Sequence, residues 1–552
     1  MVKERTKMPV VTLYYNRVKK ILGRNIPKGK LIETLPFIGL DIEDETSDHI
    51  NVEYSPNRPD YSTDYGIMTG LQGLLGIKTG MPVLKIKSGK NSIKADSTVS
   101  KVRPYVTAIE ARNGKLDDET IRQIITMQED LHNGLGRRRK KASIGIHDLE
   151  KIKFPLLYKT VTREHSFVPL ESNVSMSVKD ILEKTETGKK FKHILDGQNK
   201  VPVIVDSSGN TISLPPIANA KLTEMNTKTR NLLVEVTATD KIAAESVLAV
   251  IANTLQIAGF ELYSVKITGA GNSSPGLKSR ELVLEPELVN KTLGIEISNQ
   301  VIVKTLRKSR LDAKLRGKKI VCTIPRYRTD IFGVMDLVEE VALGYGIQNL
   351  APTMPGSVSA GERSGVTKTL ETVRQIMIGL GYLEVMNFEL TGKEILYDKT
   401  GRDASKIISV ADSKSQEHII LRDMLLPGML EVLSRNIHES YPQKIFEIGT
   451  VFEKDSPIVE SIHLACLDAH KDVNYTEVKS VLQSLLKTGF NLSCNTVSQK
   501  GPMYVDGRTA SITVKGKKLG MVGEVDGKVL DNFKLRTPAA GFEIKLSGLI
   551  FE

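Results

Sequence analysis

Apolar residues near the start of the chain alternate between short runs and helical spacing. Residues 8–15 are typical of a strand, a basic helix is predicted after them, and Gly66 to Leu75 carry apolar residues at helical spacing. Pro56 and Pro59 predict a turn before that helix. The polar stretch 85–94 is predicted to link this region to the next one.

From about residue 90 to 270 the pattern predicts a mixture of helices and strands. An amphipathic helix is expected over residues 117–136, with Asp117 or Asp118 near its cap and Gly134 at its end. A second helix is expected to end at Gly259. The strands predicted here cover residues 142–146, both sides of the turn SSGN within 201–217, and 231–240.

Residues 275–352 follow a compact order of helix, helix, strand and helix. Pro286 begins the first helix, Gly294 follows it, and Ser298 is the expected N-cap of the second. The last helix lies in the acidic segment PRYRTDIFGVMDLVEEVALGYG, residues 325–346. This arrangement resembles a winged helix.

The rest of the chain begins with a segment rich in Gly, Pro and Ser, residues 351–365, which is predicted to be a linker. A long helix is expected over residues 366–381. Strands are expected over 443–452, 509–516 and 518–525, which indicates a mixed domain on an antiparallel sheet. The fold class predicted for the whole chain is therefore multidomain α+β.

Composition narrows the class of protein. A chain of 552 residues is too long for one core, so three or four domains are expected. A net charge of +12 suits a polyanionic partner, nucleic acid first. The three cysteines are far apart and form no CxxC pair, which is typical of a reducing compartment. No signal peptide and no membrane-spanning segment is recognised, so a soluble, cytoplasmic protein is expected.

The acidic segment has an unusual charge pattern. From Thr329 to Glu362 there is no Lys or Arg. The segment holds four carboxylates, Asp330, Asp336, Glu339 and Glu340. As one helix, it would present an apolar stripe on one face and the last three acids on the opposite face. Two interpretations stay open: a solvated face with Asp330 as N-cap, or an oxygen-rich cation site that favours Mg²⁺ over zinc.

Other polar groups allow similar pairs of interpretations. The run GRRRKK, residues 136–141, is either a solvated loop or a loop that contacts phosphates. In SLPPIAN, Ser213 and Asn219 flank a turn, and Glu235 lies on the following strand. These three residues either offer hydrogen bonds to a small polar ligand, or Ser213 and Asn219 are ordinary turn residues. His147 and Asp148 are either a base with its partner or a strand-end turn.

The motifs of several common enzyme classes are absent. The chain has no GxxxxGK[ST] phosphate loop, no GxSxG elbow and no HExxH helix. The residues alone therefore indicate a basic multidomain protein with Mg²⁺ and RNA as candidate ligands.

The order of several motifs resembles the β subunit of phenylalanine–tRNA ligases of the archaeal and eukaryotic-cytosolic type. These motifs are YSPNRPD, ASIGIHDLEKI, SLPPIAN with VEVTATD, the acidic segment, and GRTASITV with LGMVGEV. The resemblance implies an α₂β₂ assembly in which Phe, ATP and tRNA(Phe) react on the α subunit. It also implies that Asp330, Asp336, Glu339 and Glu340 bind Mg²⁺ next to that α subunit.

The resemblance further implies a domain order. The expected domains are an N-terminal α/β domain (1–88), a B3/B4-like tRNA-editing domain (89–272), a winged-helix-like B5 domain with the Mg²⁺ site (273–352) and a class II synthetase-like domain (353–552). The last is expected to be catalytically inactive, because no G-x-G-x-x-x-R run supplies an ATP-binding Arg.

An editing domain has a physical reason. A hydrophobic pocket for Phe cannot strongly reject Tyr, so a second site that hydrogen-bonds the phenol is needed to hydrolyse Tyr-tRNA(Phe). The resemblance implies that this site lies around the PPI segment, and its candidate residues are Ile204, Ser213, Asn219 and Glu235.

Two alternatives come from other functional classes. The charge and the 275–352 unit would also suit a winged-helix regulator that binds nucleic acid without a protein partner. Four carboxylates would also suit a stand-alone Mg²⁺-dependent hydrolase, although no adjacent His or Lys offers a general acid.

Overall fold

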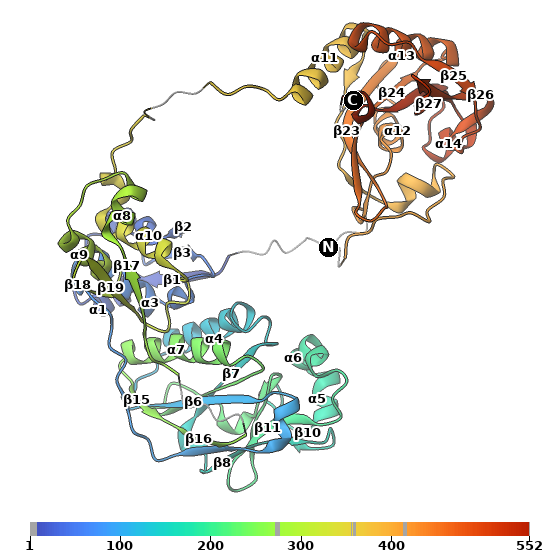
Figure 1. Ribbon diagram of the computed structural model, residues 1–552. Helices are drawn as coiled ribbons and strands as arrows, with labels where there is room; N and C mark the ends of the chain where they lie inside the picture. The colour runs from blue at the N-terminus through green and yellow to red at the C-terminus, as the bar shows by residue number, and fades with distance from the viewer. Residues whose placement is uncertain (1–7, 271–275, 355, 357–359, 412–416, 551–552) are drawn as a thin grey trace. The chain divides into compact units, whose positions relative to one another are not determined.

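The computed structural model describes residues 8–270, 276–354, 356, 360–411 and 417–550 (Figure 1). The chain divides into two compact units, Met1–Met354 and Pro355–Glu552. The division falls inside the segment 351–365 that the sequence predicts to be a linker. The further division into domains at 88, 272 and 352 stays a prediction.

The N-terminal module is a small antiparallel sheet covered by helices. Its strands, in spatial order, are β1 (Val10–Tyr14), β3 (His49–Tyr54) and β2 (Leu40–Glu45). Its helices are α1 (Tyr15–Leu22), α2 (Lys28–Thr34) and α3 (Asp64–Leu74). The predicted strand, basic helix and turn before α3 are confirmed, and the hydroxyl of Thr63 caps α3 by accepting from the Gly66 amide.

Two sheets pack face to face in the central module. The helix-backed sheet has the strand order β4 (Ile86–Lys87), β15 (Glu261–Ser264), β6 (Tyr105–Arg112), β14 (Leu232–Ala238) and β7 (Ala142–Asp148). The facing sheet has the order β13 (Ala218–Asn219), β12 (Thr211–Leu214), β11 (Val201–Val205), β8 (Leu156–Val161), β5 (Ser92–Ala95) and β16 (Lys266–Gly269).

Side chains alternate along these strands, as a strand buried on both faces requires. On β14, Val234 points to the core shared with the helices α4 (Asp118–Asn133) and α7 (Lys241–Ile257). Its neighbour Leu233 points to the facing sheet, where it packs in a core with Ile204. The outer face of the facing sheet is covered by α5 (Val178–Lys184) and α6 (Glu186–Phe191), next to the hairpin of β9 (Ser166–Phe167) and β10 (Met176–Ser177).

The predicted linker 85–94 is not a linker. It contributes β4 to the helix-backed sheet and supplies β5 to the facing sheet from Ser92 onward. Both strands pair in parallel with the end of the module, β4 with β15 and β5 with β16. The polar composition misled the prediction because both strands are short and lie at or near a sheet edge.

The last module of the first unit combines a small sheet with three helices. Its strands are β17 (Arg280–Leu284), β19 (Lys319–Ile324) and β18 (Asp312–Arg316), and its helices are α8 (Pro286–Leu293), α9 (Asn299–Lys308) and α10 (Val334–Tyr345). Pro286 at the start of α8, Gly294 after it with φ 66° and the Ser298 cap are confirmed. The strands β17 and β18 were not predicted.

The second unit is built on a mostly antiparallel sheet. Its order is β20 (Leu383–Glu384), β23 (Gln443–Glu453), β24 (Val459–Ala469), β28 (Ala539–Lys545), β27 (Lys517–Val525), β26 (Tyr504–Val514) and β25 (Asn495–Ser498). The helices α11 (Gly365–Gly379) and α13 (Tyr475–Phe490) share one core with this sheet, and α12 (Leu426–Arg435) and α14 (Gly527–Asn532) share another. The mixed domain on an antiparallel sheet is thus confirmed. No helix in the described parts of either unit has the length and apolar character needed to cross a membrane.

Candidate functional site

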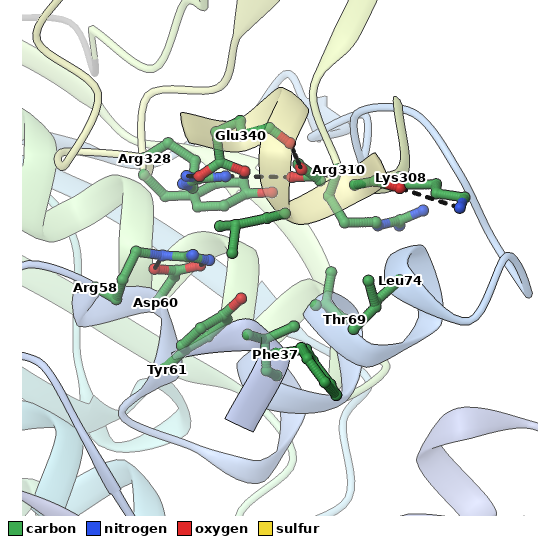
Figure 2. A pocket seen from close by; sticks show the side chains of 16 residues that line it. Phe37, Arg58, Asp60, Tyr61, Thr69, Leu74, Lys308, Arg310, Arg328 and Glu340 are labelled. Atoms are coloured by element: carbon green, nitrogen blue, oxygen red, sulfur yellow. Dashed lines mark hydrogen bonds and ion pairs between the residues drawn. The ribbon is translucent and has the colours of Figure 1, made fainter. Parts of the chain in front are cut away.

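Two of the four acids in the acidic segment are neutralised by an arginine that precedes them. The guanidinium of Arg328 is buried and forms ion pairs with Asp330, at 2.6 Å, and with Glu340. Figure 2 shows Arg328 beside Glu340. Burial raises the pKa of Asp330, but the hydrogen bond and charge of Arg328 outweigh burial and hold that pKa below its usual value. Asp330 and Glu340 are therefore a buried, charge-compensated pair around Arg328.

This cluster lies against the N-terminal module. Arg58, in the turn YSPNRPD, forms an ion pair with Asp60 at 2.8 Å and lies 4.0 Å from Asp330. Figure 2 shows Arg58 and Asp60 on the side of the N-terminal module and Arg328 with Glu340 on the other side of a small cavity. The turn and the acidic segment are thus in contact, a relation that neither segment reveals alone.

The other two acids have different surroundings. Asp336 Oδ2 accepts from the amides of Phe332, at 2.6 Å, and Gly333, at 2.8 Å, so it satisfies donors at the start of α10. Glu339 is exposed. Its pKa is raised by partial burial and then by the nearby carboxylates of Glu340, Asp336 and Asp330.

These contacts correct the helix interpretation of the segment. The helix begins at Val334, so Asp330 lies before it and the capping role belongs to Asp336. The acids do not share one face, because Glu340 is 6% exposed whereas Glu339 faces solvent. The compensating cation, Arg328, directly precedes the stretch from Thr329 to Glu362 that contains no Lys or Arg.

The segment fits Mg²⁺ only in part. In the described portions of the chain, no three His, Cys, Asp or Glu side chains gather as ligands of one ion. Asp336 Oδ1 and the Glu339 carboxylate have no ion pair among the described residues, whereas Asp330 and Glu340 are held by Arg328. Mg²⁺ is commonly held by one or two carboxylates with water in its other positions. The donor set therefore fits an ion completed from outside this chain.

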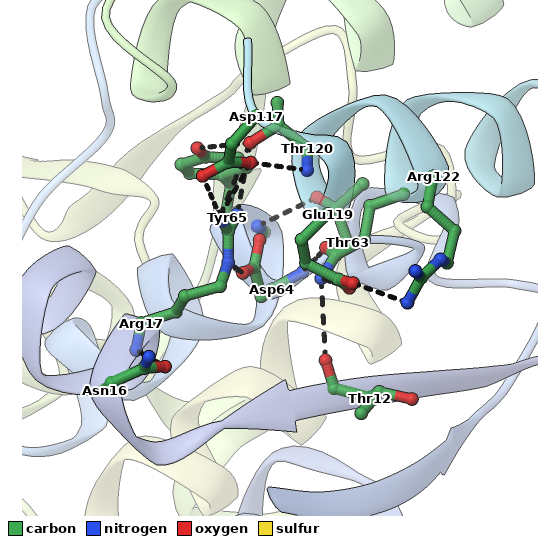
Figure 3. A network of polar contacts seen from close by, with 12 residues as sticks. Thr12, Asn16, Arg17, Thr63, Asp64, Tyr65, Asp117, Glu119, Thr120 and Arg122 are labelled. Atoms are coloured by element: carbon green, nitrogen blue, oxygen red, sulfur yellow. Dashed lines mark hydrogen bonds and ion pairs between the residues drawn. The ribbon is translucent and has the colours of Figure 1, made fainter. Parts of the chain in front are cut away.

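The N-terminal module also contacts α4 of the central module. Arg17 Nε donates to Asp64 at 2.7 Å, and its Nη1 contacts Asp117 Oδ2 at 3.0 Å (Figure 3). Asp117 is the predicted N-cap of α4 and accepts from the Thr120 amide. The start of α4 is thereby fixed by two modules, and the same helix forms a wall of the cavity described next.

A cavity of about 250 Å³ lies between the helix-backed sheet and the end of the facing sheet. Its apolar wall includes Ile121 and Ile125 of α4. Its polar lining includes Ser143, Ser213, Asn219, Thr223 and Glu235, and also Gln128, Glu129, His132 and Arg139. A cavity that combines apolar and placed polar groups is typical of a small-molecule site.

The structure brings together the residues that the sequence singled out. Ser213, Asn219 and Glu235 all line the cavity. Ile204 does not line it; this side chain is fully buried and pairs with Ser213 across β11 and β12. Ser213 in turn pairs with Asn219 across β12 and β13, so these three residues form one row across three strands.

The turn between β12 and β13 is held by an arginine of the basic run GRRRKK. Arg139 Nη1 donates to the carbonyl oxygens of Ile217, at 2.9 Å, and Pro216, at 3.3 Å, and its Nη2 contacts Glu129 at 2.7 Å. Arg139 is buried, whereas Arg137 and Arg138 are exposed. One member of the run is therefore part of the cavity wall, which neither interpretation of the run anticipated.

Glu129 and His132 complete this wall. The Ile144 amide donates to His132 Nε2 at 2.9 Å, so Nε2 carries a lone pair and Nδ1–H donates to Glu129. Burial lowers the pKa of His132, in agreement with the lone pair on Nε2. For Glu129, burial raises the pKa, but the His132 hydrogen bond and the Arg139 charge outweigh it and lower the pKa to about 2.

Glu235 lines the cavity and lies next to the buried His147. Both side chains are buried, and Glu235 Oε1 lies 3.8 Å from His147 Nε2. His147 Nδ1 contacts the Thr223 hydroxyl at 2.8 Å; that hydroxyl donates to the Ala220 carbonyl, so the histidine is the donor. Glu235 Oε2 has no hydrogen-bond partner in the described structure, and Glu235 is one of the residues that line the cavity. Asp148 instead accepts from the Thr229 hydroxyl, which fits its interpretation as part of a strand-end turn.

The second unit has its own cavity, of about 540 Å³, beside α12. A buried arginine there, Arg422, forms an ion pair with Glu447 at 2.5 Å, and Asn387 donates to the same carboxylate at 2.7 Å. The charge of Arg422 is therefore already compensated within the chain.

Comparison with known proteins points in one direction. Residues 350–546 match the family model described as "Phenylalanyl tRNA synthetase beta chain CLM domain", and residues 282–347 match "tRNA synthetase B5 domain". Among curated proteins, the chain is 36% identical to the phenylalanine–tRNA ligase beta subunit of Archaeoglobus fulgidus, over 98% of each chain. It is 35% identical to the protein of that name from Methanocaldococcus jannaschii, over 98% of this chain and 100% of the relative.

A solved structure is also similar. An N-terminal fragment of the phenylalanyl-tRNA synthetase β subunit from Pyrococcus horikoshii is 26% identical, with a TM-score of 0.59. The similarity covers 61% of this chain and 99% of the fragment.

Proposed function

This chain belongs to the family of phenylalanine–tRNA ligase β subunits, and on that premise we propose that it supports the ATP-dependent attachment of Phe to tRNA(Phe) by an α subunit in an α₂β₂ complex. The full-length match to relatives of that name carries this proposal. The members of this family are aminoacyl-tRNA synthetases, which are ligases of protein biosynthesis. A cytoplasmic location, as predicted from the sequence, belongs to the same proposal.

The test of this proposal is assembly with an α subunit. Co-expression with the α chain of the same genome is expected to give a stable complex, and only the complex is expected to charge tRNA(Phe) with Phe. A chain that remains alone and binds duplex DNA would contradict the proposal. The full-length similarity to β subunits does not favour the alternative of a winged-helix regulator.

The domain order 1–88, 89–272, 273–352 and 353–552 is part of the proposal. The B5 match over residues 282–347 supports the third domain, and the CLM match over residues 350–546 supports the fourth. We assign no catalytic role to the fourth domain. Its buried Arg422 is paired with Glu447, so this cation is not free to bind a triphosphate.

The cavity in the central module is proposed to hydrolyse Tyr-tRNA(Phe). The observation that carries this proposal is the arrangement of its lining, with apolar side chains of α4 on one wall and Glu235, whose Oε2 has no partner in the described structure, among the polar groups. A phenol matches this arrangement, because its ring suits the apolar wall and its O–H can donate to a carboxylate. Ser213 and Asn219 lie at the turn and are proposed to hold the ester end, while Ile204 supports Ser213 from the next strand.

Such a cavity would discriminate against Phe, because bound Phe leaves the polar groups of the site without hydrogen-bond partners. A site that hydrogen-bonds a hydroxyl discriminates strongly against the analogue without it, since its own polar groups lose water and gain no partner. No side chain at the turn is an activated nucleophile, and the attacking group is proposed to be water.

The editing proposal is tested with Asn219→Ala in the αβ complex. Hydrolysis of Tyr-tRNA(Phe) is expected to fall at least about tenfold while Phe charging stays unchanged. The matched control is Asn133→Ala, because Asn133 is exposed at the end of α4. Undiminished hydrolysis by Asn219→Ala would remove this residue from the site, and absence of hydrolysis by the wild type would overturn the editing proposal.

Mg²⁺ is proposed to bind at Asp330, Asp336, Glu339 and Glu340, shared with the α subunit. Asp336 and Glu339 would contact the ion, while Asp330 and Glu340 support the segment through Arg328. Bound there, the ion supplies positive charge where the carboxylates of this helix would repel one another. A stand-alone hydrolase gains little support, since two of the four acids are occupied by Arg328.

Glu339→Gln tests the ion separately from the fold, because Glu339 is exposed. The variant is expected to assemble less well with the α subunit and to lose the response of assembly to Mg²⁺. Glu287→Gln, an exposed acid of the same module, is the control. Unchanged assembly and an unchanged Mg²⁺ response would count against the site.

A further inference from the structure

A buried cation lies next to the cavity and has no acidic contact partner. Arg103 is 2% exposed, and none of its contacts in the described structure is a carboxylate. Its guanidinium donates to the carbonyl oxygens of Lys140, Arg139 and Thr237 at 3.2, 3.1 and 2.9 Å. Its Nε–H donates to the hydroxyl oxygen of Thr237 at 3.0 Å. Burial lowers the pKa of Arg103 to about 10, so the group remains charged at neutral pH.

The contact with Arg103 determines the direction of two further hydrogen bonds. A guanidinium only donates, so Thr237 Oγ1 accepts and must place its own hydrogen elsewhere. Thr237 is fully buried, and within the described structure the acceptor within reach is Ser143 Oγ at 3.0 Å. Leaving that hydrogen without an acceptor would cost about 1–3 kcal/mol. Ser143 therefore accepts from Thr237, and its own hydrogen is free to point into the cavity that it lines.

The donor on Ser143 lies beside the acceptor on Glu235. Strands β7 and β14 pair Ser143 with Thr237 and Gly145 with Glu235, which makes Ser143 and Glu235 diagonal neighbours on one face. Both line the cavity, and Glu235 Oε2 is unpartnered there. A fixed O–H donor next to a fixed carboxylate acceptor matches a ligand group that both donates and accepts one hydrogen bond. A phenolic hydroxyl is such a group.

We propose that Ser143 is a specificity-determining residue of the editing site, whose hydroxyl donates to the phenolic oxygen of tyrosine while Glu235 accepts the phenolic hydrogen. Arg103 and Thr237 are positioning residues that hold Ser143 in the donor orientation. This inference rests on the proposed editing function and deepens it. Phenylalanine would leave both Ser143 and Glu235 without a partner, so the pair discriminates by hydrogen bonding rather than by size.

The test uses the αβ complex and two non-hydrolysable probes, adenosine carrying tyrosine or phenylalanine through a 3′-amide. Ser143→Ala is expected to weaken binding of the tyrosyl probe at least about tenfold and to change binding of the phenylalanyl probe less than about twofold. Ser143→Thr keeps the hydroxyl and is expected to restore tyrosyl binding. Thr237→Val removes the positioning hydroxyl and is expected to give an intermediate loss, again for the tyrosyl probe alone.

The phenylalanyl probe also reports that the cavity is intact in each variant. Equal losses for both probes, or unchanged tyrosyl binding by Ser143→Ala, would overturn the role of Ser143 while the wild type still hydrolyses Tyr-tRNA(Phe). A wild type that neither binds the tyrosyl probe nor hydrolyses Tyr-tRNA(Phe) would overturn the editing function itself, and the role of Ser143 with it.

Discussion

Gly145 lies directly opposite Glu235 across strands β7 and β14, and a Cβ atom on Gly145 would stand 2.3 Å from Glu235 Oε1. The same Cβ would lie 2.4 Å from His147 Nε2. The glycine thus leaves the space in which the buried carboxylate and imidazole meet. No other residue fits at this position without displacing one of them.

Gly145→Ala is therefore expected to push Glu235 out of place. Overpacking of this kind costs about 1–3 kcal/mol of stability, and hydrolysis of Tyr-tRNA(Phe) is expected to fall by more than tenfold because the acceptor is displaced. Gly29→Ala, where nothing lies within 4 Å of the added carbon, is the control. Wild-type hydrolysis rates in Gly145→Ala would show that Glu235 is not needed where it lies.

Arg328→Met would leave the buried Glu340 without its cation and Asp330 with Arg58 alone, at 4.0 Å. Asp330 and Glu340 are 11% and 8% exposed at their side chains, so the expected loss of stability is about 3–5 kcal/mol. Denaturant unfolding of the isolated chain measures it. Glu339→Gln, at the exposed acid, is expected to stay within about 0.5 kcal/mol of the wild type. Equal stabilities of these two variants would contradict the charge compensation by Arg328.

Arg139→Met would release the turn at Pro216 and Ile217. The two backbone carbonyls lose their donor, and the cavity wall is expected to loosen, so that hydrolysis of Tyr-tRNA(Phe) falls about tenfold or more while Phe charging is retained. Arg122→Met removes a cation from the exposed side of α4, where Arg122 is 65% exposed, and serves as the control. If both variants lose hydrolysis equally, the effect is one of general charge and not of the turn.

Glu129 predicts a dependence of stability on pH. Its pKa is lowered to about 2 in the folded chain, so its contribution is complete above the pKa of the unfolded chain and is lost as pH falls towards 2. The wild type is therefore expected to be more stable than Glu129→Gln at pH 6, and the difference should shrink between pH 4.5 and pH 2. Denaturation midpoints of both proteins across this range measure the difference. A difference that grows on acidification would reverse the sign assigned to this carboxylate.

How far the site follows from sequence depends on the kind of residue. The Pro-Pro turn alone left Ser213, Asn219 and Glu235 open between turn residues and ligand-binding groups, and the resemblance to the family singled them out; the structure places all three on one cavity. Arg139 was missed because a run of like charges carries no periodic sign of which member points inward. The three arginines 137–139 have positive φ angles, so no regular spacing applies there.

In the acidic segment the prediction differs from the structure at Glu340, which was placed with the exposed Glu339 but is buried. The predicted helix covered the acidic segment, although α10 begins at Val334, and the face opposite its apolar stripe, with Glu339 and Glu340, was predicted to share one environment. Glu340 is buried because Arg328, outside the helix, folds back onto it. Arg328 pairs with Asp330 and Glu340, 2 and 12 residues further along, and Arg103 contacts Arg139 and Thr237, 36 and 134 residues away. No helical or strand spacing relates either arginine to its partners.

The pairing of β4 with β15 and of β5 with β16 has a consequence for synthesis on the ribosome. Both strand pairs join the first residues of the central module to its last, so β4 waits for β15, which ends at Ser264, and β5 waits for β16, which ends at Gly269. Contacts between distant segments form slowly because the loop between them must be closed first. Until then β4 has no strand partner and one edge of β5 is unpaired, so the nascent module exposes open strand edges that chaperones of the growing chain can recognise.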